Sequence, residues 1–310
     1  MSPETITIHK PVEGFVHEYA PRMTAFEFKN KEAQSQKVLL FIGGLTDGLL
    51  TVPYLPDLSA GLDKIGWTLV QILFTSSYMG WGTGSLERDA YEIGLLVEYL
   101  RSERGGSRDR VVLMGHSTGC QDTIQYLAKY APKEPTKQVD GGILQAAVSD
   151  REAIFHELQE QGKGWEDLEE LNALARSYVS EGRAYEVLPT KYSDLFLGAP
   201  INAYRWLSLA TKLGDDDFFS SDLTLKDNKQ TFGMVTRPIM VLNSENDQFY
   251  PDYVDKQALM TQWKSATPEE FWSPHSGLIP GALHNIGPGS APDAVSWTVD
   301  RVCKFCMDLE

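Results

Sequence analysis

The stretch that decides the fold is Val111-Val112-Leu113-Met114-Gly115-His116-Ser117-Thr118-Gly119-Cys120. An apolar run of strand length ends in a Gly-x-Ser-x-Gly turn, and a helix-period pattern follows at once and stops at Pro132. A serine at the apex of such a turn has a strained backbone, and glycines on both sides let strand and helix pass closely. The pattern predicts that Ser117 is a nucleophile; the alternative is a structural turn.

A second glycine-rich loop follows the apolar run Val38-Leu39-Leu40-Phe41-Ile42. It reads Gly43-Gly44-Leu45-Thr46-Asp47-Gly48, and glycines let a backbone approach a ligand closely. We expect this loop to present an N–H group toward Ser117, where it would stabilise a developing oxyanion together with N–H groups at the positive end of the following helix. The alternative is a turn without a chemical role.

Strand and helix patterns alternate along most of the chain. Apolar strand runs at 38–42, 67–74, 111–114 and 142–148 are separated by helical patterns, which predicts an α/β fold with a parallel sheet covered on both faces. Short strands around Ile6, 15–19 and 25–28 suit an antiparallel edge.

Residues 150–236 break this rhythm with a long, polar and mainly helical segment. A connection of this length needs structure of its own, so we expect an inserted helical cap over the catalytic edge. The predicted division is a core part at 1–149, the cap at 150–236 and a second core part at 237–310. The run Asp215-Asp216-Asp217 could bind a metal, but adjacent aspartates do not face one point, so we expect a solvated loop.

A carboxylate and a histidine follow late in the chain. The strand run 238–243 is followed by Glu245 and Asp247, and a carboxylate there can orient an imidazole. Asp247 is preferred because it lies further from the strand and closer to the turn; the alternative is that both cap a helix. His284 lies on a glycine-rich loop before the terminal helix and is the expected base, with His275 as the competitor.

Charge and composition limit the classes of partner. The chain has 310 residues and a net charge of −15, which argues against nucleic acid and anionic membranes. No signal-like start or long apolar run is seen, so no membrane insertion is expected. The three cysteines do not form a disulfide framework, which suits a cytoplasmic protein, and Cys303 and Cys306 are read as core-facing helix residues.

The order Ser117, Asp247, His284 resembles the α/β-hydrolase fold, with a mostly parallel doubly wound sheet. The resemblance implies that Ser117 is the nucleophile, that His284 is the general base and then acid, and that Asp247 holds the imidazole. It also implies an oxyanion hole from the N–H groups of Leu45 and Thr118. Many members carry His-Gly where this chain has Gly43-Gly44.

Three stretches resemble, more narrowly, the fungal family of intracellular siderophore esterases of the SidJ type: 41–49, 115–122 and 244–247. This resemblance implies a small-molecule substrate, a ferric hydroxamate siderophore of the fusarinine C type, whose ester bonds are cut to release iron. No cofactor and no resident metal are implied, since iron would belong to the substrate. Alternatives are a general carboxylesterase, lipase or acyltransferase of the same fold, or a non-catalytic binder. The insertion is polar and acidic, whereas an extensive apolar cap would favour lipid substrates, so a lipase is the less favoured alternative.

Overall fold

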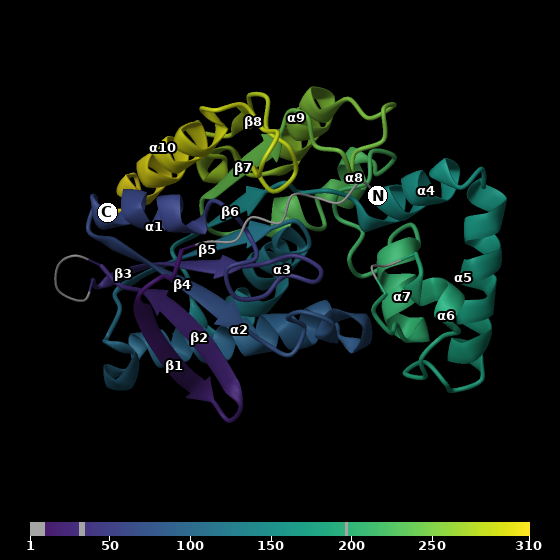
Figure 1. Cartoon of the computed structure of the whole chain (residues 1–310), viewed down its shortest axis with the longest axis horizontal. Helices are drawn as coiled ribbons and strands as arrows, with labels where there is room; N and C mark the ends of the chain where they lie inside the picture. The colour runs from purple at the N-terminus through teal and green to yellow at the C-terminus, as the bar shows by residue number, and fades with distance from the viewer. Residues whose placement is uncertain (1–9, 31–34, 196–197) are drawn as a thin grey trace.

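The computed structural model describes residues 10–30, 35–195 and 198–310 (Figure 1). Within this part, one sheet has the strand order β1-β2-β4-β3-β5-β6-β7-β8. β1 and β2 form an antiparallel hairpin at one edge, β2 is antiparallel to β4, and the other pairs are parallel. The strands are β1 Gly14–Ala20, β2 Met23–Phe28, β3 Lys37–Ile42, β4 Trp67–Leu73, β5 Arg110–His116, β6 Gly141–Gln145, β7 Ile239–Ser244 and β8 Gly277–Ile279.

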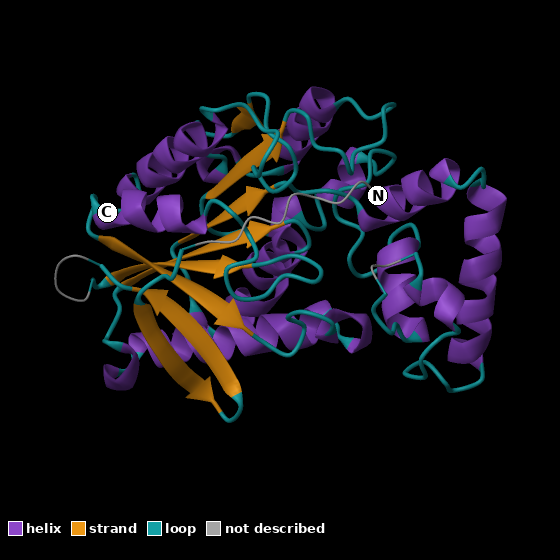
Figure 2. Cartoon of the chain, viewed as in Figure 1, coloured by secondary structure: helices purple, strands orange, loops and turns teal. Residues whose placement is uncertain are grey.

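Helices cover both faces of the sheet (Figure 2). The α-helices are α1 Leu55–Asp63, α2 Leu86–Arg101, α3 Gly119–Gln125, α4 Asp150–Glu160, α5 Trp165–Ser180, α6 Thr190–Ser193, α7 Ala203–Ala210, α8 Leu225–Asn228, α9 Lys256–Ala266 and α10 Ala294–Met307. Alternate residues of β3 enter different cores: Leu40 belongs to the cluster that includes residues of α2, α3 and α9, whereas Leu39 belongs to the cluster that includes residues of α1 and α10. Because side chains alternate along a strand, an apolar run such as 38–42 must be covered on both faces.

The predicted α/β fold with a mostly parallel sheet is confirmed. The expected strands at 38–42, 67–74 and before Ser117 are β3, β4 and β5. The strand expected at 142–148 ends at Gln145, because Ala146 has a left-handed backbone with φ of 56°. The strand expected around Ile6 lies outside the described residues.

The segment between β6 and β7 carries helices α4 to α8. Figure 1 shows α4, α5, α6 and α7 grouped at the right, beyond the arrowheads of the central strands. These helices share a hydrophobic core in which Trp206, Tyr192 and Leu158 are fully buried, and Trp81 joins it from outside the segment. Polar groups inside it are paired, since Trp206 Nε1 donates to Asn172 Oδ1 at 2.8 Å and Tyr192 Oη donates to the Leu171 carbonyl at 2.7 Å. The segment is therefore packed, not a loose loop.

The expected solvated loop at Asp215–Asp217 is wrong for two of its three members. Asp216 and Asp217 are buried, with 2% and 7% exposure. Asp216 Oδ2 lies 2.5 Å from Arg205 Nη1, and Asp217 Oδ2 lies 3.5 Å from Arg151 Nε. A buried guanidinium needs a carboxylate beside it, and this requirement draws the run inward.

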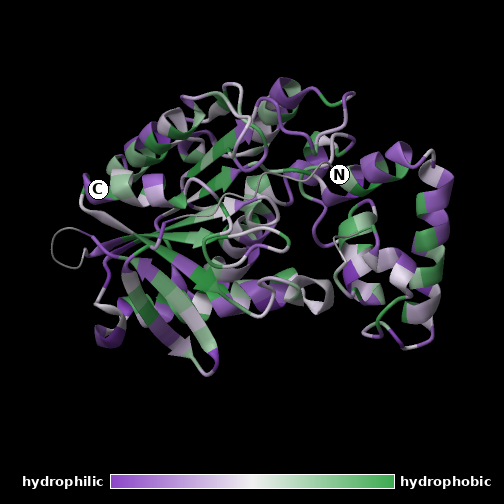
Figure 3. Cartoon of the chain, in the orientation of Figure 1, coloured by the Kyte–Doolittle hydropathy of each residue, from purple (hydrophilic) through white to green (hydrophobic). Residues whose placement is uncertain are grey.

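Apolar and polar residues are distributed as this packing requires. Figure 3 shows hydrophobic colour along the central strands and mixed colour along α4 and α5, which have one face in the insertion core. In the part of the chain that the structure describes, no helix combines the length and apolar character needed to cross a bilayer.

Candidate active site

Ser117 stands at a sharp turn between β5 and α3. Its backbone is left-handed, with φ of 54°, and its N–H donates to the Gln145 carbonyl at 3.0 Å. A Cβ atom at Gly115 would lie 2.1 Å from the Gly119 carbonyl oxygen, and one at Gly119 would lie 2.4 Å from the Ile42 carbonyl oxygen. Both glycines of the Gly-x-Ser-x-Gly pattern are thus required by close backbone approach, as in a nucleophile elbow.

The glycine-rich loop after β3 touches the serine. A Cβ atom at Gly44 would lie 2.6 Å from Ser117 Cβ and 3.1 Å from Ser117 Oγ. Asp47 holds this loop, because its Oδ2 accepts from the Gly44 N–H at 2.8 Å and its Oδ1 accepts from the Thr51 hydroxyl at 2.7 Å. The side chain of Asp47 thus fixes a loop that lacks the His-Gly of many α/β hydrolases, a role the sequence did not indicate.

Leu45 and Thr118 carry the two N–H groups expected to form the oxyanion hole. Within the described residues, neither backbone N–H donates a hydrogen bond to another protein group. Thr118 is also the residue that precedes the first turn of α3. Two unpaired donors beside a serine, one of them at the positive end of a helix, are suited to an oxygen that becomes negative.

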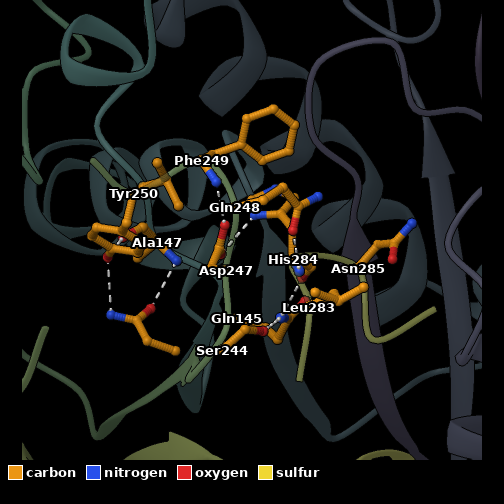
Figure 4. Close-up of polar contacts among 12 residues, drawn as sticks. Gln145, Ala147, Ser244, Asp247, Gln248, Phe249, Tyr250, Leu283, His284 and Asn285 are labelled. Carbon is orange, nitrogen blue, oxygen red and sulfur yellow. Dashed lines mark hydrogen bonds and ion pairs between the residues drawn. The ribbon is translucent and has the colours of Figure 1, made fainter. Parts of the chain in front are cut away.

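Asp247 and His284 are brought together from loops after β7 and β8 (Figure 4). The distance from His284 Nδ1 to Asp247 Oδ2 is 2.7 Å, and the two side chains are 8% and 0% exposed. Asp247 Oδ1 accepts from the Phe249 N–H at 3.0 Å, and the His284 N–H donates to Gln248 Oε1 at 3.1 Å. Both partners are therefore fixed by further hydrogen bonds.

The two competing residues have other contacts. Glu245 Oε2 accepts from the Gly281 N–H at 2.7 Å, so this carboxylate holds the loop that leads to His284. His275 Nε2 lies 2.9 Å from Asp308 Oδ2, on the residue that follows α10. Neither Glu245 nor Asp247 caps the helix that follows them, α9: its N-cap is Asp255, whose side chain accepts from the Ala258 N–H.

Gln145 connects these loops, a role that the sequence did not predict. Its side chain is fully buried at the end of β6, and its Nε2 donates to the His284 carbonyl at 3.1 Å. Its Oε1 accepts from Tyr54 Oη at 3.0 Å and lies 2.6 Å from His116 Nδ1. Burial and the neighbouring His284 lower the pKa of His116 to about 4, so His116 is neutral at pH 7. A polar residue at the end of an otherwise apolar strand run is the signal that could have found it.

All these groups lie at one edge of the sheet. The loop with Leu45 follows β3, Ser117 follows β5, and the loops with Asp247 and His284 follow β7 and β8. The carboxyl ends of parallel strands meet at one edge, which is where open α/β sheets bind ligands. In the described residues, no group of three His, Cys, Asp or Glu side chains is placed to hold a metal ion.

A partly open cavity lies beside the glycine-rich loop after β3 and beside Thr118, the residue that follows Ser117. Gly44, Leu45 and Trp81 also line it. The polar and charged residues of the lining include Ser76, Asp89, Asp122 and Arg205, the last from the segment between β6 and β7. Two further aromatic residues, Tyr78 and Trp206, are not among the lining residues: Tyr78 is half exposed, and Trp206 is buried in the hydrophobic core shared by α4 to α7.

The family model described as "Protein of unknown function (DUF1749)" matches residues 2–307. A UPF0613 protein of Schizosaccharomyces pombe is 40% identical over 308 residues, which cover 93% of this chain and 95% of that protein. The "Fusarinine C esterase sidJ" of Aspergillus fumigatus is 35% identical over 340 residues, with 96% of each chain covered.

Solved structures agree with the fold. "Siderophore hydrolase EstB from Aspergillus fumigatus" superimposes with a TM-score of 0.82 and 34% identity, covering 96% of this chain and 98% of that chain. A structure titled "Alpha/Beta hydrolase fold protein of unknown function" gives a TM-score of 0.67 at 18% identity over 97% of each chain, which shows the fold alone.

Proposed function

The chain belongs to the DUF1749 family, and from this premise we propose that it is a serine esterase that hydrolyses the ester bonds of a hydroxamate siderophore of the fusarinine C type. The observation that carries the esterase proposal is the pairing of His284 with Asp247 at 2.7 Å, at the sheet edge that also holds Ser117. The substrate class is supported by the two relatives named for siderophore hydrolysis.

In the proposed mechanism, Asp247 accepts a hydrogen bond from Nδ1–H of His284, which leaves the lone pair on Nε2. Ser117 Oγ attacks the ester carbonyl carbon while Nε2 removes its proton, and the N–H groups of Leu45 and Thr118 stabilise the oxyanion. Collapse expels the alcohol, which takes the proton from His284, and leaves an acyl-enzyme. Water then attacks by the same route and releases the acid.

Each proton in this cycle moves between substrate, water, Ser117 and His284, so the mechanism requires no cofactor of the protein's own. Iron enters as cargo of the siderophore, and cutting the ring weakens its hold on the ion. We also place the reaction in the cytoplasm, because all three cysteines are free thiols, as a reducing compartment allows. Fractionation of the source cells, with detection of the native protein, tests this location.

The test of the proposed function compares ferric fusarinine C and its triacetylated form by mass spectrometry. The wild-type protein is expected to convert at least one intact ring into linear product, and Ser117→Ala to lower that rate by at least about a thousandfold, as loss of a triad member does. Ser296→Ala is the matched control, since Ser296 lies on α10 and its hydroxyl donates only to the Asp293 carbonyl.

Two results would contradict the proposal. In the first, the wild-type protein leaves both siderophore rings intact but cleaves a small activated ester in a Ser117-dependent way. This result would support a general esterase and contradict the siderophore as substrate. Ring cleavage that survives Ser117→Ala would remove the nucleophile.

A further inference from the structure

The cavity lined by Leu45 and Thr118 borders the proposed oxyanion hole. Its wall is built from the loops after β3 and β4 and from α2, α3 and α7. Among the described residues that line it, none comes from the loops that carry Asp247 and His284. In the proposed mechanism His284 protonates the leaving alcohol, which places the alcohol on the His284 side and the acyl part toward the cavity.

Asp122 lines this cavity and carries a carboxyl oxygen, Oδ1, that has no hydrogen-bond partner among the described residues. It lies on α3, one helical turn after Thr118, and is 5% exposed. Its Oδ1 is buried and makes no hydrogen bond to any described residue. Asp89, on the same wall, accepts from the Ser76 hydroxyl at 2.6 Å. A buried carboxyl without a donor is costly, so its presence at the cavity wall calls for a ligand that supplies one.

Negative groups outnumber positive ones around this wall. Arg205 is the cation that lines the cavity, and it is already bound to Asp216 and to the Trp81 carbonyl. Burial and the neighbouring Asp89 raise the pKa of Asp122 well above its usual range, while Arg205 acts in the opposite direction. A cation placed in the cavity would favour the ionised carboxylate and would form a charge-assisted hydrogen bond with it.

Resting on the proposed function, we propose that Asp122 is the anchor of an acyl-side subsite for an ammonium group, so that the preferred substrates are amino esters with the ammonium close to the ester carbonyl. The spacing fits, because Asp122 stands one turn, about 5.4 Å, along α3 from the Thr118 N–H that would bind the carbonyl oxygen. An ammonium on the α carbon falls between these groups. No group of three His, Cys, Asp or Glu side chains that could hold a metal ion exists among the described residues.

The experiment uses three phenyl esters that differ at one position. Phenyl alaninate carries an α-ammonium, phenyl isobutyrate replaces it with a methyl group of similar size, and phenyl N-acetylalaninate carries a neutral amide. Phenol release is measured by chromatography and corrected for uncatalysed hydrolysis. We expect the wild-type kcat/KM for the alaninate to exceed that for the isobutyrate at least tenfold.

Two variants separate the anchor from general effects of charge. Asp122→Asn is expected to lower kcat/KM for phenyl alaninate at least tenfold and to leave that for phenyl isobutyrate within twofold. Asp150→Asn is the matched control: Asp150 belongs to the same group of buried acids but lies outside the cavity wall and accepts from Gln121 Nε2 at 2.6 Å. It is expected to keep the wild-type preference.

A measurement on the wild-type protein covers the case in which Asp122→Asn does not fold. Alaninamide is expected to inhibit hydrolysis of phenyl isobutyrate at least tenfold more strongly than isobutyramide does. Equal inhibition, absence of a preference in the wild type, or equal loss on all esters in Asp122→Asn would overturn the subsite. If no ester is hydrolysed in a Ser117-dependent way, the esterase proposal fails and the subsite with it; hydrolysis of phenyl isobutyrate alone keeps the esterase.

Discussion

The loops around the proposed triad are held by an amide side chain and a carboxylate side chain. Gln145 touches the His284 carbonyl with one end and His116 with the other, and its backbone carbonyl receives the Ser117 N–H. Asp47 plays the same part for the glycine-rich loop, through the Gly44 N–H. Such contacts fix loops on which chemistry depends, because a shift of about 1 Å is costly in rate.

His116 gives a prediction for the dependence of stability on pH. Its pKa falls from 6.5 to about 4 on folding, so the unfolded chain binds a proton between these values and the folded chain does not. The stabilisation is complete above pH 6.5 and is lost as the pH falls toward 4, by about 3 kcal/mol from this group.

Denaturant unfolding of the wild-type protein and of His116→Asn at pH 7 and pH 4.5 measures this contribution. The wild type is expected to lose more free energy of unfolding than the variant over this range. Parallel curves for the two proteins would mean that the ring is not buried in its neutral form.

At the scale of secondary-structure elements, the sequence predicts those elements that a short, continuous run of residues encodes. The β5 run, the Gly-x-Ser-x-Gly turn and the helix after it were readable because strand burial, glycine spacing and helix period all lie within a short window. β8 was missed because three residues, Gly277–Ile279, carry too little pattern. Gln145 ends an apolar run, which marks it as unusual, but its partners Tyr54 and His284 lie 91 and 139 residues away, so the sequence does not predict what it holds.

The elbow itself gives a prediction. In Gly119→Ala, the new Cβ atom would lie 2.4 Å from the Ile42 carbonyl and 2.9 Å from the Gly43 carbonyl, both backbone atoms. α3 must then move away from β3, and we expect the free energy of unfolding to fall by about 1–3 kcal/mol, as overpacking costs.

Gly164→Ala is the control, since a Cβ atom there meets nothing within 4 Å and the backbone φ is −130°. Chemical denaturation should show a loss of less than about 1 kcal/mol for this variant, because Gly164 is the N-cap of α5, where alanine is less favourable than glycine. Equal stability of Gly119→Ala and wild type would show that the strand and helix are less tightly joined than described.

At the scale of the whole molecule, the insertion meets the sheet domain at the cavity. The Asn202 N–H donates to the Gly82 carbonyl at 2.9 Å, and Arg205 reaches the Trp81 carbonyl from α7. The break in the sequence pattern after residue 150 predicts an insertion, but it does not predict the contact with 81–82, which joins segments more than 100 residues apart. The lining of the cavity therefore includes residues from both segments.

This contact gives a prediction about the insertion. A Cβ atom in Gly82→Ala would lie 2.0 Å from the Pro200 carbonyl, so the insertion must shift. We expect faster proteolysis within 150–236 and a higher KM, with the sheet domain still folded.

Gly277→Ala is the control, because its nearest new contact is Trp297 at 3.7 Å. Limited proteolysis followed by mass mapping reads out the cut sites. Cleavage of Gly82→Ala at the wild-type rate would show that the contact does not hold the insertion in place.

The spread of the site along the chain has a consequence during synthesis. The ribosome completes the turn with Ser117 long before it reaches β8 and His284. Under the proposed mechanism, a nascent chain carries the nucleophile without its base, so the enzyme stays inactive until His284 has been translated. A premature stop before residue 284 would likewise yield an inert product.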